Sequence, residues 1–136
     1  MKKGLSELLK LHTLEYFGKS KHKLVPQSMI ETEDVLLLDV RSNEEFASLT
    51  MPLRIFENIK YLHIPCNEVP GRINDISKDK NIAIFCSSNF RSTLVYAYLM
   101  SEGYESVRIL DGGYAALTDA IMPGKVYKHV SGDYQG

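Results

Sequence analysis

Three short apolar runs recur along the chain without the alternation of polar and apolar positions that marks a half-exposed strand. They cover residues 35–40, 82–85 and 107–110, and they are rich in leucine or β-branched residues. Such runs are typical of strands buried on both faces of a parallel sheet. Between the last two, residues 92–102 have apolar positions at helical spacing, and Gly103 follows as a helix-ending residue. Buried strands that alternate with helices predict an α/β domain with a mostly parallel sheet.

Weaker signals predict further elements around the first of these strands. Leucines at three- and four-residue spacing predict an amphipathic helix over residues 6–17, ended by Gly18. Its leucine stripe is expected to pack on the core rather than to form a dimer face. Residues 19–33 predict a polar connector with at most one short strand. A short helix over residues 43–49 and a strand over residues 59–64 complete the predicted elements.

The composition fits one domain spanning residues 1–136, because 44% apolar and 24% charged residues are ordinary for a globular chain. A net charge of -1 gives no electrostatic reason to expect nucleic acid or an acidic membrane surface as a partner. The longest purely apolar run, residues 35–38, is far short of the roughly 20 residues of a membrane helix, and we expect no membrane and no export signal.

The cysteines and histidines narrow the chemistry. Only Cys66 and Cys86 occur, so no disulfide framework is expected, and a cytoplasmic location is the default. The four histidines lack the spacing of metal ligands. We therefore expect neither a metal nor another cofactor.

The candidate chemistry lies in the loop after the strand at residues 82–85. Cys86 stands at the carboxyl end of that strand, where parallel α/β sheets bind their ligands, and four residues separate it from Arg91. Such a loop, closed by a helix that starts near Ser92, can turn successive N–H groups inward and stabilise an anion or a thiolate. Arg91 adds a guanidinium suited to an oxyanion. Asn89, in mid-loop, is a residue type that tolerates a positive φ.

This arrangement resembles the active-site loop of the rhodanese family. Residues 37–46 are similar to the first sequence block of that family and residues 103–114 to its last, so the resemblance covers about residues 35–116. It implies a three-layer, rhodanese-like α/β fold: a largely parallel five-stranded sheet with helices on both faces. Residues 1–30 would then form an N-terminal helix and connector ahead of the matched region.

The resemblance also implies a sulfurtransferase that carries sulfur as a persulfide on Cys86. The implied substrate-binding residues are those that cradle the outer sulfur: Ser87, Ser88, Asn89, Phe90, Arg91 and Ser92. The implied partners are a small-molecule sulfur donor and a thiol or other thiophilic acceptor, and a protein acceptor stays open. Many thiosulfate-using relatives have a basic residue where this chain has Ser87 and a glycine where it has Asn89. Residues 51–58 also differ from the stretch that the family usually has before its second strand. These departures argue against thiosulfate as the physiological donor.

Two other functions stay open. A rhodanese fold can serve as a binding or persulfide-sensing module, although the presence of Cys86 counts against that use. A cysteine-based phosphatase or arsenate reductase fits less well, because cysteine phosphatases have a loop one residue longer to accommodate a tetrahedral phosphate.

Several polar residues near the loop have structural interpretations. Arg91 could pair with Glu44 or Glu45 as well as bind an anion, and Asp39 and Arg41 are expected to form an ion pair rather than to act in catalysis. Cys66 is either a resolving thiol for Cys86 or inert. The Gly112-Gly113 pair predicts a tight turn into the last helix.

Overall fold

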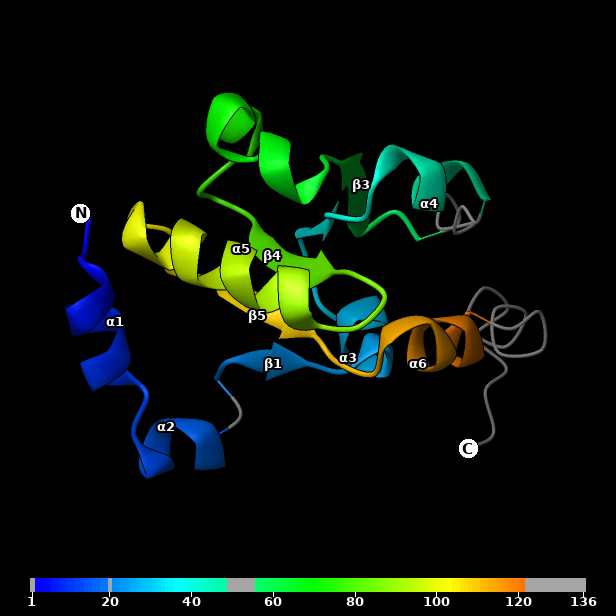
Figure 1. The fold of residues 1–136 in the computed structure, drawn as a ribbon. Helices are drawn as coiled ribbons and strands as arrows, with labels where there is room; N and C mark the ends of the chain where they lie inside the picture. Colours follow the sequence, from blue (N-terminus) through cyan, green and yellow to red (C-terminus); the bar gives the residue numbers. More distant parts are fainter. Residues whose placement is uncertain (1, 20, 49–55, 122–136) are drawn as a thin grey trace.

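The fold is a sheet of five parallel strands with helices packed against both faces (Figure 1). A computed structural model describes residues 2–19, 21–48 and 56–121. The strand order is β1-β5-β4-β2-β3. The strands are β1 Lys23–Leu24, β2 Val35–Asp39, β3 Ile59–His63, β4 Asn81–Phe85 and β5 Val107–Leu110. The predicted mostly parallel sheet is confirmed, and all its described pairings are parallel.

Alternate side chains of the central strands enter two separate cores. On β4, Ile82 and Ile84 face one side, whereas Ala83 and Phe85 face the other. The first core is covered by α1, α5 and two short 3-10 helices, and the second by α3 and α6. The described helices are α1 Leu5–Leu11, α2 Leu14–Gly18, α3 Pro26–Ile30, α4 Asn43–Ser48, η1 Cys66–Glu68, η2 Pro70–Asp75, α5 Phe90–Ser101 and α6 Gly113–Ala120. Burial on both faces explains why the central strands β2 and β4 are largely apolar.

The predicted helix over residues 6–17 is wrong as a single element, because it is broken into α1 and α2. The side chain of Thr13 accepts a hydrogen bond from the N–H of Tyr16, and this cap starts a second helix. The Nδ1 atom of His12 lies 2.6 Å from the carbonyl oxygen of Leu8. Both contacts are local side-chain bonds that apolar spacing does not encode.

The leucine stripe packs on the core through only one of its members. Leu8 is 3% exposed and lies among α5 residues, whereas Leu5, Leu9 and Leu14 are exposed by 64%, 68% and 88%. The interpretation of the whole stripe as a core-facing surface is therefore wrong for these three residues.

Other boundaries differ by small amounts. The connector over residues 19–33 contains the two-residue strand β1 and also α3, which begins at Pro26 and was not predicted. The helix expected from residue 92 begins at Phe90. Leu49, the predicted end of the short helix, lies outside the described residues, as do residues 51–55. Within the described part of the chain, the helices are all too short or too polar to span a bilayer.

Candidate functional site

Cys86 lies at the carboxyl edge of the sheet, directly after β4. Its side chain is fully buried, and its Sγ accepts a hydrogen bond of 3.3 Å from the backbone N–H of Ser92 in the first turn of α5. The N-terminus of a helix presents unpaired N–H groups and the positive end of the helix dipole. The sulfur of Cys86 therefore faces the first turn of α5 through a hydrogen-bond donor.

The loop after Cys86 is short because α5 begins at Phe90. Asn89, the residue before the helix, has a left-handed conformation with φ 66° and ψ -11°. The prediction of a positive φ at Asn89 is confirmed, and asparagine tolerates this region better than most residues with a Cβ. The chain thus turns from the strand into the helix over residues 87–89, which holds the start of α5 against Cys86.

Arg91 is held by Glu45, a residue of α4. Its Nη1 donates to Glu45 Oε1 at 2.6 Å and its Nη2 to Oε2 at 3.0 Å, a two-point pair. Nη2 also donates to the hydroxyl oxygen of Ser87 at 3.0 Å, and that hydroxyl donates to Glu45 Oε2 at 3.2 Å. The expected pairing with Glu44 or Glu45 is therefore made by Glu45, and it links the cysteine loop to α4.

Glu45 is itself fixed at the start of α4. The N–H of Ser42 donates to Glu45 Oε1 at 3.1 Å, and the Ser42 hydroxyl accepts from the N–H of Glu45 at 3.2 Å. This reciprocal pair is a capping box. The hydrogen bonds from Arg91 and from the Ser42 N–H hold the pKa of the Glu45 carboxyl well below its usual range. At neutral pH, Glu45 is therefore ionised and compensates the charge of Arg91.

Asp39 and Arg41 form a separate buried ion pair at the carboxyl end of β2. Both side chains are fully buried, and Arg41 Nη2 lies 2.6 Å from Asp39 Oδ2. The guanidinium carbon lies 5.3 Å from the centre of the Phe85 ring and 5.4 Å from that of Tyr114. The expected ion pair is confirmed. Through Arg41 it links β2 to Phe85 of β4 and to Tyr114 of α6.

Gly112 and Gly113 form the predicted turn into α6, with φ values of +93° and +58°. Gly113 also has a role that was not predicted from the amino-acid sequence. A Cβ atom on Gly113 would lie 2.8 Å from the carbonyl oxygen of Ser87. The start of α6 therefore supports the cysteine loop from the second side of the sheet, and only a glycine allows this approach.

The predicted site residues divide into two groups. Cys86 contacts Ser92, and Ser87 contacts Arg91, whereas Ser88 and Phe90 are exposed, Phe90 by 70%. Ser92 is fully buried, yet its hydroxyl has no hydrogen-bond partner among the described residues, and neither has the side-chain oxygen of Asn89. Buried polar atoms without a partner are costly unless something else binds there.

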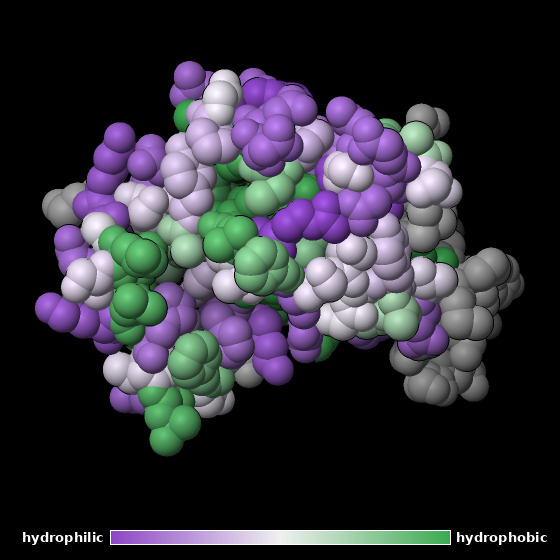
Figure 2. Space-filling model, viewed as in Figure 1, coloured by the Kyte–Doolittle hydropathy of each residue, from purple (hydrophilic) through white to green (hydrophobic). Residues whose placement is uncertain are grey.

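The surface beside this loop is hollowed and partly apolar. Figure 2 shows a depression between α5 and the η1–η2 segment, with apolar surface on the α5 side. Phe90 and Leu94, one turn apart on α5, are exposed by 70% and 51%. An exposed apolar rim next to a polar loop suits a ligand that has both kinds of surface.

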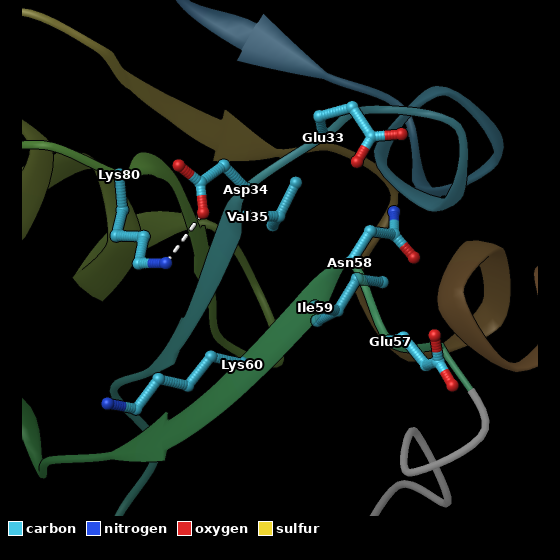
Figure 3. A pocket seen from close by; sticks show the side chains of 8 residues that line it. All are labelled: Glu33, Asp34, Val35, Glu57, Asn58, Ile59, Lys60 and Lys80. Carbon is cyan, nitrogen blue, oxygen red and sulfur yellow. Dashed lines mark hydrogen bonds and ion pairs between the residues drawn. The ribbon is translucent and has the colours of Figure 1, made fainter.

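A second hollow lies at the opposite, amino edge of the sheet, among residues at the starts of β2 and β3 (Figure 3). Its charged side chains are Glu33, Asp34, Glu57, Lys60 and Lys80, and Asp34 and Lys80 form an ion pair of 2.6 Å at one side of it (Figure 3). None of the predicted site residues lines it. Among the described residues, no group of three or more histidine, cysteine or acidic side chains could hold a metal ion.

A parallel α/β sheet with a cysteine-to-arginine loop at its carboxyl edge defines the class of this protein. The family model described as Rhodanese-like domain matches residues 26–120, and the chain belongs to the rhodanese-like family. The match contains β2 to β5, the cysteine loop and α6.

Among curated relatives, a sulfurtransferase from Allochromatium vinosum is 39% identical over 97 residues, which cover 71% of this chain and 84% of the relative. The putative sulfurtransferase YtwF from Bacillus subtilis is 32% identical over 67% of this chain and 81% of its own length. Among solved structures, an NAD-dependent persulfide reductase from A. fulgidus superposes with a TM-score of 0.55 at 30% identity, over 75% of this chain and 17% of the reductase.

Proposed function

We propose that this protein is a sulfurtransferase that carries sulfane sulfur as a persulfide on Cys86. The thiolate of Cys86 attacks the outer sulfur of a small-molecule donor, and the donor's remaining group leaves with the electron pair of the broken bond. A thiol or another thiophilic acceptor then takes the sulfur and returns Cys86 to its thiolate. The sulfurtransferases among the curated relatives support this assignment.

The observation that carries the proposal is the contact between Cys86 Sγ and the N–H of Ser92. It places the thiol against the first turn of α5, where N–H groups stabilise both the attacking thiolate and a persulfide anion.

The charge of the loop favours a donor with little negative charge. Glu45 compensates Arg91, so the loop offers less net positive charge than a free arginine would. Ser87 is neutral at a position that is basic in many thiosulfate-using relatives. Because thiosulfate brings two negative charges and its sulfite leaving group is also an anion, a low-molecular-weight persulfide suits this loop better.

The test is to incubate the reduced protein with thiosulfate, and separately with a low-molecular-weight persulfide, and to record intact masses. We expect a gain of one sulfur atom, about 32 Da, in the wild type and in Cys66→Ser but not in Cys86→Ser, with faster loading from the persulfide. If folded protein with a free thiol gained no sulfur from either donor, the binding or persulfide-sensing module would become the better assignment.

A further inference from the structure

Cys66 lies on the same face of the sheet as Cys86. Cys66 packs against the core cluster that contains Cys86, on the side covered by α5. It begins η1, which contacts α5. Cys66 is partly exposed, whereas Cys86 is fully buried. The two thiols therefore share one region of the protein but differ in their access to solvent.

Backbone hydrogen bonds fix the two cysteines on either side of Val40. The N–H of Cys66 donates to the carbonyl oxygen of Val40 at 3.1 Å, and the N–H of Val40 donates to Phe85 at 2.9 Å. Neighbouring strands lie about 4.8 Å apart, so one intervening strand puts the Cα atoms of the cysteines about 10 Å apart. Both thiols thus stand at the carboxyl edge of the sheet, next to the same loop.

The electrostatic interactions of Cys66 agree with this placement. Burial raises the pKa of the Cys66 thiol, Arg91 lowers it, and the nearby Cys86 raises it further. Glu45 raises the pKa of Arg91 most, and the charges of the two cysteines raise it as well. Cys66 is therefore within electrostatic reach of the two residues that define the loop.

We propose that Cys66 is a second sulfur carrier, which takes the outer sulfur from the Cys86 persulfide and presents it to external acceptors. This inference rests on the proposed function. The Cys66 thiolate attacks the outer sulfur, and a new S–S bond forms on Cys66. The bond between that sulfur and Cys86 Sγ breaks, and its electron pair stays on Cys86 as the thiolate. The proton lost by Cys66 goes to solvent, so the step needs no oxidant or reductant.

Distance and leaving-group chemistry both favour transfer over a direct disulfide. A disulfide requires Cα atoms about 4.4–6.8 Å apart, closer than these two, whereas a persulfide extends the reach of Cys86 by one S–S bond of about 2 Å. A thiolate that is better stabilised leaves faster. Cys86 Sγ accepts a hydrogen bond from the N–H of Ser92, so Cys86 is suited to be the leaving thiolate.

The relay can be tested by peptide mapping, because trypsin cleavage puts the two cysteines on different peptides. Cleavage after Lys60 and Arg72 releases residues 61–72 with Cys66, and cleavage after Lys80 and Arg91 releases residues 81–91 with Cys86. The full chain is loaded with a low-molecular-weight persulfide, sampled over time, blocked with an alkylating reagent and digested. Transfer to reduced glutathione is followed in parallel for wild type, Cys66→Ser and Cys86→Ser.

We expect sulfur first on residues 81–91 and then on residues 61–72 of the wild type. In Cys86→Ser neither peptide should gain sulfur, and in Cys66→Ser sulfur should stay on residues 81–91 and pass to glutathione several-fold more slowly. Three results would each overturn the relay: sulfur confined to residues 81–91 of the wild type, equal loading of Cys66 in Cys86→Ser, or a disulfide joining the two peptides. Absence of sulfur from both peptides would refute the proposed function itself, and the relay with it.

Discussion

Arg91 and Glu45 face each other through two hydrogen bonds, Nη1 to Oε1 at 2.6 Å and Nη2 to Oε2 at 3.0 Å. The pair joins α5 to α4, and the Ser87 hydroxyl lies within the same network. Since Arg91 follows Cys86 by only a short loop, this contact sets the position of the loop as well as its charge. The geometry of the Arg91–Glu45 pair and the ionisation of Glu45 can each be tested.

Arg91→Lys should slow the loading of Cys86 roughly tenfold, because one ammonium group cannot bond both Glu45 oxygens and Ser87 in the plane of a guanidinium. The measurement is the rate of persulfide formation by intact mass. Arg72→Lys is the matched control, since Arg72 pairs with Asp75 on the surface. Equal rates in the two variants would mean that the geometry of Arg91 is unimportant.

The ionisation of Glu45 should make the free energy of unfolding depend on pH. Its pKa is lower in the folded protein than in the unfolded chain, so its contribution is full above the unfolded value, about 4.3, and falls as pH decreases toward the folded value. The pair is partly exposed, and we expect about 1 kcal/mol or less. In urea unfolding, wild type should exceed Glu45→Gln at pH 6, and the difference should shrink at pH 3. A difference that grew at pH 3 would contradict this sign.

Gly113→Ala should destabilise the protein by about 1–3 kcal/mol, because the new Cβ meets the Ser87 carbonyl and the residue is held at a positive φ. Sulfur loading should also slow, since the strain falls on the cysteine loop. Gly71→Ala is the control: its Cβ would meet nothing within 4 Å, and its φ is not positive. Urea unfolding and loading rates of both variants would check the prediction, which fails if the two behave alike.

Asp39→Asn should cost about 3–5 kcal/mol, because it leaves the guanidinium of Arg41 buried without its counter-charge. Asp75→Asn breaks an exposed pair and should cost less than about 1 kcal/mol. The free energy of unfolding, measured in urea, distinguishes the two. A loss at Asp39 no larger than at Asp75 would show that the buried pair contributes little to stability.

Substitutions at Leu8 and Leu9 test which face of α1 contributes to the stability of the fold. Leu8 is 3% exposed and Leu9 is 68% exposed, although they are adjacent on one helix. We expect Leu8→Ala to cost about 2–4 kcal/mol of unfolding free energy, and Leu9→Ala to stay within about 0.5 kcal/mol. Comparable losses would mean that Leu9 is covered in solution, for example by a second copy of the chain.

The sheet could be predicted from the sequence because burial on both faces leaves a direct signal. Residues 35–38 and 82–85 are uninterrupted apolar runs, and they lie in β2 and β4. Cys86 could be placed for the same reason, since the end of a buried strand is also the edge of the sheet. The positive φ of Asn89 followed from the length of the loop and the residue type.

The remaining features depend on contacts between distant parts of the chain or on single hydrogen bonds. Glu44 and Glu45 were equivalent in the sequence, and only the orientation of α4 selects Glu45. The approach of Gly113 to Ser87 joins the first residue of α6 to the loop after β4. The break before Thr13 arises from one cap hydrogen bond, which the leucine spacing does not reveal.

The way α1 is attached has a consequence for motion. The contacts between the α1 region and α5 include the buried side chain of Leu8, the 2.8 Å bond from the Lys3 N–H to Ser101, and the 2.7 Å contact between His12 Nε2 and the Tyr96 hydroxyl. Because Leu8 is the one residue of α1 that is buried, α1 should open while the sheet stays folded. In hydrogen exchange, the amides of α1 should therefore exchange with solvent long before those of β4, through a local opening that leaves the cysteine loop in place.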